Sequence, residues 1–176
     1  RATKFCRPPV RIDLHLILSE PIFLRSFFIY RLCKQDVERC PNKDIQQKND
    51  IDVDDFKQIN DTSGHAAGDY YLRQIAEVIR TVYGRHGDCY RYGGDEFSLI
   101  LTKNLHQMEK LNGMFEAALG QLREQDPQMP MVSLGYALYE GGIEALYATI
   151  EKADAMMYRN KKVNDRAEIV EIAAEI

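Results

Sequence analysis

Several features that would place this chain in a special class of protein are absent from its 176 residues. No run of about 18 apolar residues occurs, so no transmembrane helix is expected. The most apolar stretch, residues 14–30, is interrupted by charged residues and a proline. No internal repeat or low-complexity segment is present either. With 45% hydrophobic and 28% charged residues, the composition is that of a soluble globular protein, and the length predicts one domain.

Cysteine-based sites are also missing. The four cysteines form no CxxC pair, and no histidine lies at zinc-finger spacing. We therefore expect free thiols in a reducing compartment, and a cytoplasmic location for this segment. The N-terminus lacks the apolar run and cleavage site of a signal peptide. Because the first residue is arginine rather than methionine, we expect a fragment of a longer protein, whose other parts could attach it to a membrane.

An excess of positive charge, the usual mark of a protein that binds polyanions, is missing as well. The net charge is −4, so we expect no nucleic-acid partner and no membrane contact by this segment. The charge is unevenly distributed, since residues 1–51 carry a net +4 and residues 52–176 a net −8. The acidic part contains carboxylate clusters that look like metal sites, so the net charge alone would mislead about an anionic substrate.

Apolar spacing predicts short strands that alternate with amphipathic helices. The clearest helix follows Asp69, where apolar residues recur at i, i+3, i+4, i+7 and i+11 as far as Tyr83. From residue 50 onward the predicted order is βαββαβα, which begins with the ferredoxin-like split arrangement. We therefore predict an α+β fold, a mainly antiparallel central sheet flanked by helices that cover one of its faces. The expected elements are helix 21–39, strand 50–53, helix 70–83, strands 89–92 and 97–101, helix 105–123, strand 131–139 and helix 143–162.

Two clusters of carboxylates stand out. Residues 52–55 read DVDD, and on a strand Asp52 and Asp54 would point to the same side. Asp95 and Glu96 follow two glycines in a predicted hairpin turn. Mg²⁺ takes one or two carboxylates together with substrate phosphates, so two such clusters at neighbouring strand ends could form its site. The residues alone leave open the alternative that both clusters are solvated acidic turns, in which Asp is common.

The paired glycines of this hairpin, Gly93 and Gly94, allow two interpretations. Glycine permits positive φ and lets a bulky ligand approach the backbone closely. A type I′ hairpin turn with no ligand at all favours the same residues. Spacing alone does not separate the two.

Four motifs together resemble the GGDEF domain, the diguanylate cyclases of bacterial signalling. Residues 92–97 read YGGDEF, residues 52–61 DVDDFKQIND, residues 64–69 GHAAGD and residues 153–158 ADAMMY, with Lys161 beyond. They occur in the family's order across roughly residues 50–163. The resemblance implies a nucleotidyl-cyclase or polymerase-palm fold, and the condensation of two GTP molecules into cyclic di-GMP with release of two pyrophosphates. It also implies Mg²⁺ or Mn²⁺ as cofactor and a homodimer whose two subunits face each other.

The resemblance assigns a role to individual residues of these motifs. Glu96 is implied to be either a further metal ligand or the group nearest the attacking hydroxyl, and Asn60 and Asp69 are implied to hydrogen-bond guanine. The implied metal-binding set is Asp52, Val53 through its carbonyl, Asp95 and Glu96; the catalytic set is Asp95, Glu96, Lys57 and Arg91; the substrate-binding set is Asn60, Asp69, Gly93, Gly94 and Lys161. The two basic residues of the catalytic set would lie near phosphates or orient carboxylates. The lysine of the substrate-binding set would contact the terminal phosphates.

The chain departs from the family pattern in its first third and near its end. Residues 45–51 read IQQKNDI where the family has an apolar strand, and so polar a strand would pack badly in a central position. After Lys161 the sequence reads NDR at residues 164–166, so the family's phosphate-binding arginine is absent in register. We expect the catalytic domain at residues 45–165. Residues 1–44 form a poorly matching lead-in with a first helix, and residues 166–176 a tail that resembles an amphipathic helix.

These departures keep open an alternative function. A GGDEF domain that is catalytically weak or inactive would act as a binding module for GTP or cyclic di-GMP. In either case the resemblance implies an N-terminal sensory domain in the full-length protein, because regulatory domains of this family usually lie on that side.

Overall fold

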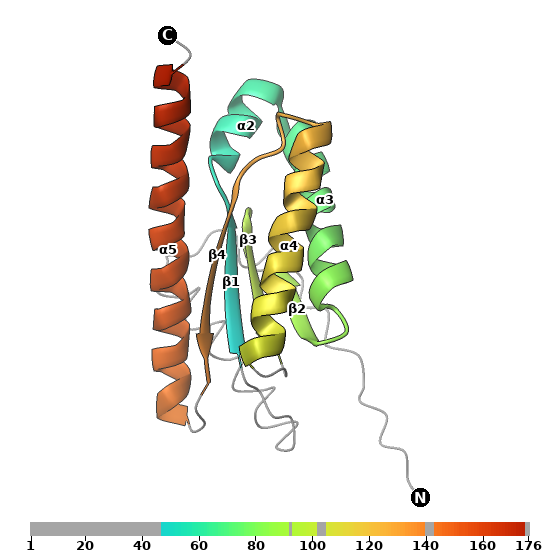
Figure 1. Cartoon of the computed structure of the whole chain (residues 1–176). Coiled ribbons are helices and arrows are strands. Elements are labelled where there is room, and N and C mark those ends of the chain that lie inside the picture. The colour runs from blue at the N-terminus through green and yellow to red at the C-terminus, as the bar shows by residue number, and fades with distance from the viewer. Residues whose placement is uncertain (1–46, 92, 102–104, 140–142, 175–176) are drawn as a thin grey trace, which may run out of the picture.

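A computed structural model describes residues 47–91, 93–101, 105–139 and 143–174 of the chain, and for residues 105–106, 143–144 and 165–174 it describes the backbone alone. This part of the chain contains four strands and four helices (Figure 1). In chain order they are β1 (Gln47–Val53), α2 (Phe56–Ser63), α3 (His65–Tyr83), β2 (Gly87–Arg91), β3 (Glu96–Leu101), α4 (Leu105–Gln125), β4 (Val132–Leu138) and α5 (Ile143–Ala174).

Among the described residues, the predicted elements are found in their predicted order, with differences at β1, α2, α3 and α5. Helix α2 was not predicted, and α3 begins at His65 rather than after Asp69. The predicted final helix and the helical tail form one continuous helix, α5, which runs to Ala174. The predicted helix 21–39 lies outside the described residues. Within the described ranges, no helix is long and apolar enough to cross a bilayer.

The sheet has the strand order β2-β3-β1-β4, and all neighbouring strands are antiparallel. This is the ferredoxin-like arrangement that the element order predicted, so the α+β fold class is confirmed. β1 is a central strand, bonded to β3 on one side and to β4 on the other. Its register places Asp52 opposite Glu96 of β3 and opposite Ser133 of β4.

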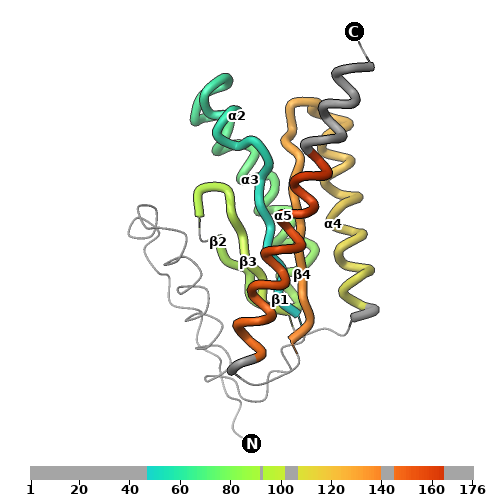
Figure 2. Tube along the Cα trace, turned by 90° about the vertical axis from the view of Figure 1, so that its left-hand side faces the viewer, coloured from blue at the N-terminus to red at the C-terminus, as the bar shows by residue number. Residues whose placement is uncertain are grey.

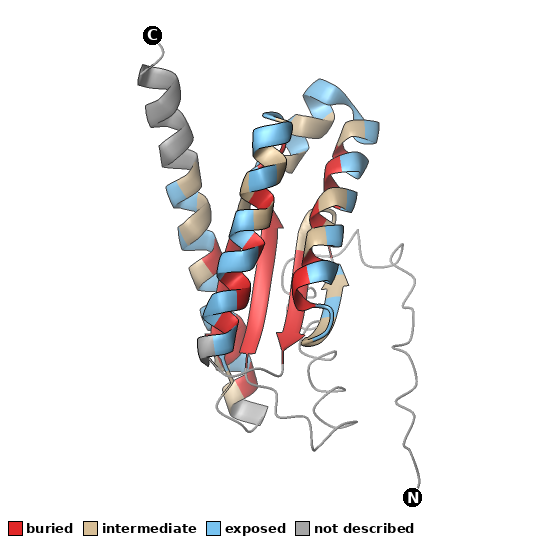
Figure 3. Ribbon diagram, turned by 45° about the vertical axis from the view of Figure 1, so that its right-hand side comes forward, coloured by how far each residue is buried: buried red, intermediate tan, exposed pale blue. Residues whose placement is uncertain are grey.

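Helices cover both faces of the sheet. α3 and α4 pack on one face over the main core, whereas α5 lies along β4 and β1 on the other face (Figure 1, Figure 2). The prediction that helices cover one face is therefore wrong, because α5 has an apolar stripe of its own. Its residues Leu146 and Ile150 form a smaller cluster with Ile100 of β3. Figure 3 shows buried residues along the central strands and on the inward sides of the helices.

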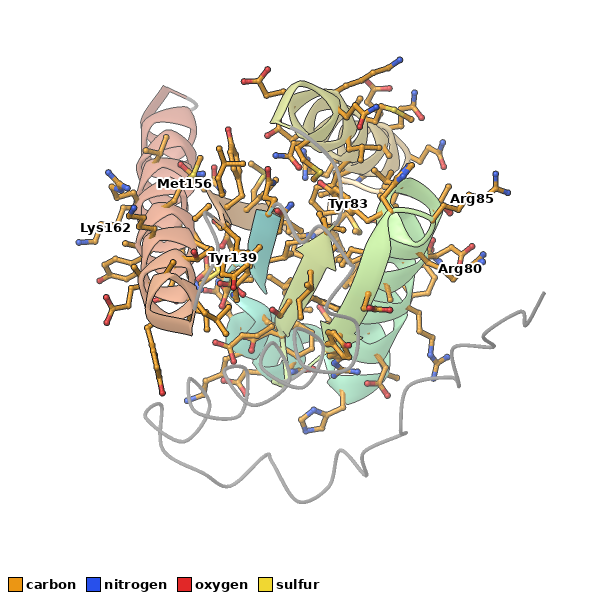
Figure 4. All side chains as sticks on the ribbon, turned by 90° about the horizontal axis from the view of Figure 1, so that it is seen from below. Arg80, Tyr83, Arg85, Tyr139, Met156 and Lys162 are labelled. Carbon is orange, nitrogen blue, oxygen red and sulfur yellow. The ribbon has the colours of Figure 1, made fainter. Side chains whose placement is uncertain are left out.

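β1 is longer and more polar than the predicted strand at residues 50–53. It begins at Gln47, and all seven of its residues are buried. On the face towards α3 and α4, Gln47 Nε2 donates to Asn49 Oδ1 at 2.6 Å, and Asn49 Nδ2 donates to Asn112 Oδ1 of α4 at 3.3 Å. The Tyr83 hydroxyl, directed from α3 towards the interior (Figure 4), donates to the same Asn112 oxygen at 2.9 Å. The polar side chains therefore bond to one another, which compensates in part for their removal from water.

On the face towards α5, β1 buries an ion pair. The side chains of Lys48 and Asp50 are both 3% exposed and form a salt bridge. Lys48 lies opposite Ile100, a member of the apolar cluster under α5. Asp50 Oδ1 has no hydrogen-bond partner in the described part of the chain. Because the desolvation of two charges offsets their attraction, such a pair adds little net stability.

We expect the double variant Lys48→Met, Asp50→Leu to be more stable than the natural sequence by about 1–4 kcal/mol, because it removes both desolvation penalties. Lys48→Met alone should lower the free energy of unfolding by about 3–5 kcal/mol, since it leaves the Asp50 carboxylate buried without its cation. Urea unfolding followed by circular dichroism measures both changes. A double variant that unfolds at lower urea concentration than the natural sequence would contradict this expectation.

Candidate functional site

The two acidic clusters meet at one end of the central strand pair. Asp52 of β1 lies opposite Glu96 of β3, so both side chains project from the same face of the sheet. The Val53 N–H donates to the Asp95 carbonyl at 3.1 Å and extends the ladder by one bond beyond that pair. Asp54 projects to the same side as Asp52, as the alternation predicted, because it bonds Ser133, which lies opposite Asp52. We call this group, Asp52, Asp54, Asp95 and Glu96, the carboxylate edge.

Lys161 of α5 reaches the carboxylate edge and forms an ion pair with Asp52. Burial raises the pKa of Asp52 above its usual value, and the negative charges of Asp95 and Asp54 add to this rise, which Lys161 opposes. Burial alone would lower the pKa of Lys161, but its bond to Asp52 outweighs that effect and the pKa is raised. The lysine therefore stays charged, and it is the cation that partly neutralises this end of the sheet.

Asp54 is held by a polar network that joins three elements. Its Oδ2 accepts from Ser133 Oγ of β4 at 2.9 Å and from Asn164 Nδ2 of α5 at 2.8 Å. Asn164 Nδ2 also lies 3.1 Å from Ser133 Oγ. Sequence reasoning assigned no role to Ser133 or Asn164. The alternation of β4 contained a signal for Ser133, because apolar residues at 132, 134, 136 and 138 leave residue 133 on the opposite face.

The predicted guanine-binding pair lies at the corner between α2 and α3. α2 ends at Ser63, and Gly64 turns the chain with a φ of 83°, a conformation that favours glycine. α3 then packs back so closely that a Cβ on Gly68 would lie 2.2 Å from Asn60 Oδ1. Asp69 follows Gly68 and is exposed. The structure therefore brings Asn60 beside the turn that carries Asp69, and the two glycines of the GHAAGD motif make that approach possible.

Of the two hairpin glycines, Gly93 is required for space rather than for positive φ, whereas a Cβ on Gly94 would meet no atom within 4 Å. Among the described residues, Gly64 is the glycine with positive φ, so Gly93 and Gly94 do not form the type I′ turn that was one of the two interpretations. A Cβ on Gly93 would instead lie 2.3 Å from Glu96 Oε2, because the Glu96 side chain folds over this position. Arg91 braces the turn, since its Nη2 donates to the Gly94 carbonyl at 2.7 Å.

Lys57 is the predicted site residue that the structure leaves apart from the others. It lies in the first turn of α2, and its exposed side chain forms no hydrogen bond or ion pair with the described residues. The helix begins after Asp55, whose φ of 51° is a left-handed conformation that Asp tolerates better than most residues. Lys57 therefore follows Asp52 and Asp54 closely in the sequence, but its side chain points into solvent.

A hollow of about 510 Å³ adjoins the site. It lies between α2, the connection from α4 to β4, and α5, and its walls include Asp54, Asn164 and Arg123. Neither Asn60 nor Asp69 lines it. The hollow is therefore a neighbour of the carboxylate edge, separate from the predicted guanine-binding pair.

Comparison with known protein families and curated proteins agrees with the motifs. A family model described as the diguanylate cyclase GGDEF domain matches residues 38–166. Diguanylate cyclase A of Treponema denticola is 31% identical over 118 residues, which cover 64% of this chain and 31% of that protein. Diguanylate cyclase DgcS of Shewanella oneidensis is 34% identical over 113 residues, which cover 63% of this chain and 37% of that protein. The chain thus spans about a third of the length of these relatives.

Solved structures show the same fold. Diguanylate cyclase SiaD of Pseudomonas aeruginosa, solved with its activator SiaC, superposes with a TM-score of 0.64 at 26% identity, covering 78% of this chain and 55% of that one. The GGDEF domain of DgcB from Caulobacter crescentus, solved with c-di-GMP, superposes with a TM-score of 0.62 over 90% of this chain and 94% of that one. Its identity of 23% supports the fold alone. Because the family model matches well over half of the residues, the chain belongs to the GGDEF domain family.

Proposed function

We propose that this domain is a diguanylate cyclase, which condenses two GTP molecules into cyclic di-GMP and releases two pyrophosphates. The observation that carries the proposal is the carboxylate edge, where Asp52 lies opposite Glu96, beside Asp95, and binds Lys161. Solvated acidic turns, the alternative that the sequence left open, do not explain why a largely buried carboxylate and a lysine from a distant helix share this edge. Transfer of phosphate groups depends on positioning and charge neutralisation, which carboxylates that hold a metal ion and a lysine that contacts phosphate can supply.

The residues at this edge fit Mg²⁺ or Mn²⁺. Carboxylate and carbonyl oxygens are the donors these ions prefer, and Asp52, Asp95 and the Val53 carbonyl would hold the ion, with Glu96 as a further ligand or nearest the attacking hydroxyl. Burial raises the pKa of Asp52, and the neighbouring carboxylates Asp95 and Asp54 raise it further, so a cation at this edge would be stabilising. In the described ranges no three acidic, His or Cys side chains converge on one point, so phosphate oxygens of GTP would complete the coordination. The bound ion would activate the attacking hydroxyl and neutralise the leaving pyrophosphate.

The other residues would bind and orient GTP. Asp69 can accept from guanine N1–H and from the exocyclic amine, and Asn60 can bond the ring edge. Lys161 would contact the terminal phosphates. Arg91 already holds the hairpin through the Gly94 carbonyl, so its role would be to orient the carboxylates. Lys57 is free to turn towards phosphates from its exposed position.

The chemistry requires two copies of the domain. Each 3′-oxygen would form a bond to the α-phosphorus of the other GTP, while the bond from that phosphorus to the departing pyrophosphate breaks and the hydroxyl proton is lost. In-line attack in both directions needs two bound GTP molecules held face to face. We therefore propose a homodimer in which each subunit holds one GTP, and an N-terminal sensory domain in the full-length protein that controls their approach.

A second candidate function is a domain that binds GTP or cyclic di-GMP without appreciable turnover. It is favoured by Asp165, which stands where the family pattern has a phosphate-binding arginine. It is also favoured by α5, which continues as a helix through that position. Incubation of the protein with GTP and Mg²⁺ separates the two candidates. Cyclic di-GMP and pyrophosphate identify the enzyme, and bound nucleotide without pyrophosphate identifies the binding module.

Replacing either Asp52 or Asp95 with Ala should lower cyclic di-GMP formation by about 10³-fold, because loss of a metal ligand removes several kcal/mol of transition-state stabilisation. Glu124→Ala removes the same charge from the exposed side of α4 and should leave the rate unchanged. Thermal melting of each variant shows that the fold is kept. Activity of Asp95→Ala within a few-fold of the natural protein would refute the assignment of the carboxylate edge.

Gly68→Ala should weaken GTP binding although residue 68 itself makes no contact with the base in this proposal. The added Cβ would lie 2.2 Å from Asn60 Oδ1, and the short amide side chain would have to move. Losing one hydrogen bond to the base should raise the dissociation constant of a non-hydrolysable GTP analogue by about tenfold, measured by calorimetry. The substitution should not destabilise α3 itself, because Ala has a higher helix propensity than Gly.

The matched control for this variant is Gly113→Ala on α4, where an added Cβ meets no atom within 4 Å. It should stabilise its helix and leave GTP binding unchanged. If Gly68→Ala binds the analogue as tightly as the natural protein, Asn60 has no part in base recognition.

Asp69→Ser should relax the preference for GTP over ATP, because a site that bonds one base leaves polar groups unpaired with another.

A further inference from the structure

The side of α5 that faces the sheet changes character along the helix. Its first half presents the buried apolar residues Leu146, Ile150, Ala153 and Met157, spaced for one face of a helix. One turn further, the same face becomes polar and carries Asn160, Lys161 and Asn164, which are partly buried. Asn160 Nδ2 donates to the Leu134 carbonyl of β4 at 2.6 Å. The helix therefore rests on the core at one end and on hydrogen bonds at the end beside the carboxylate edge.

Two contacts from this polar end reach alternate residues of one strand segment. Lys161 binds Asp52, and Asn164, three residues further, binds Asp54. Three residues of helix advance about 4.5 Å, and two residues of extended chain about 6.6 Å. The contacts therefore lie next to each other between α5 and the end of β1, with Asp52 in the strand and Asp54 just beyond it. Asp54 and Ser133, which receive the Asn164 amide, are 4% and 1% exposed. The second contact thus joins α5 to two groups that are fixed in the interior.

We propose that Asn164 is a positioning residue that fixes Lys161 at the carboxylate edge. Lysine has a long, flexible side chain, and alone it would not define where its ammonium group lies. The clamp of Asn164, Asp54 and Ser133 fixes the helical turn from which Lys161 extends. Lys162, the next residue, lacks this role because it projects away from the sheet (Figure 4) and lies over the Tyr158 ring at 4.5 Å from its centroid.

The consequence for substrate rests on the proposed function, in which Lys161 contacts the terminal phosphates of GTP. Loss of the clamp should then weaken binding of the triphosphate and leave recognition of guanine intact. A residue that merely stabilised the helix would affect both ends of the nucleotide equally. Alanine forms helices better than asparagine, so a loss in Asn164→Ala cannot come from helix propensity.

The first measurement needs no ligand. Hydrogen exchange of the backbone amides of residues 158–164, followed by mass spectrometry, should be about fivefold faster in Asn164→Ala, the factor that one hydrogen bond contributes to such an equilibrium. Asn164→Asp has the same shape but places a carboxylate against Asp54, so exchange should be faster still. Thr149→Val, which removes a side-chain bond to Ala145 at the other end of α5, should leave exchange in residues 158–164 unchanged.

The second measurement is a double-mutant cycle on nucleotide binding. In Mg²⁺, Asn164→Ala should raise the dissociation constant of a non-hydrolysable GTP analogue about fivefold and that of GMP by less than twofold. The same substitution made in Lys161→Ala should have no further effect, because the group that it positions is gone. In Lys162→Ala, the matched lysine control, it should retain its full fivefold effect.

The outcomes separate this inference from the proposed function. Natural exchange rates at residues 158–164 in both Asn164 variants would overturn the clamp, whether or not GTP binds. Faster exchange, together with a natural protein that binds neither analogue nor GMP, would leave the clamp in place and refute the proposed function. Faster exchange with equal weakening of the GTP analogue and GMP would reduce Asn164 to a structural residue and overturn its positioning role.

Discussion

The register of β1 between β3 and β4 is the constraint on which the rest of the site depends. Because antiparallel partners share a face, this register alone places Asp52 beside both Glu96 and Ser133. A slip of one residue would turn Asp52 towards the core under α3 and α4 and would turn Ile51 towards α5. The apolar residues Ile51 and Val53, which are fully buried, prevent that slip. The core therefore fixes the geometry of the acidic side chains on the opposite face.

The first half of β1 shows how far this constraint can carry an unfavourable sequence. Gln47, Lys48, Asn49 and Asp50 have little tendency to form a central strand, yet they lie between two complete ladders that satisfy their backbone groups. Their side chains pair within the strand and with Asn112. Such pairing limits the penalty of burial and supplies little net stability. The free energy that holds β1 must then come mainly from its neighbours and from the apolar end that leads into the site.

The sequence was sufficient to predict the helices and strands in which apolar residues recur at regular spacing. Helix α4 and strands β3 and β4 were predicted to within a few residues. The end of α3 and the start of α5 were also predicted, but α3 begins earlier and α5 runs further than expected. The motifs predicted which acidic residues belong together. The polar start of β1 was missed, since only its neighbours make it a strand, and α2 was missed because its eight residues include none that is buried. In the sequence, Asn164 was only a departure from the family pattern. Its bond to Asp54 forms because α5 continues past Lys161 and packs beside β1, and no local sequence pattern predicts that contact.

The ion pair between Asp52 and Lys161 connects the free site to its proposed chemistry. Without ligand, each group is the other's counter-ion. Burial is the main cause of the raised pKa of Asp52, and Asp54 and Asp95 raise the pKa of both groups further. A nucleotide with its divalent cation brings the two missing partners at once, since a cation suits Asp52 and a phosphate suits Lys161. The ion pair between Asp52 and Lys161 would be replaced by two, one between Asp52 and the cation and one between Lys161 and the phosphate. Neither buried charge would then be left without a partner, which would be costly in a site of low dielectric constant. The same exchange gives a reason for anchoring the lysine, because an ammonium group that wandered into solvent would leave Asp52 uncompensated before the nucleotide arrived.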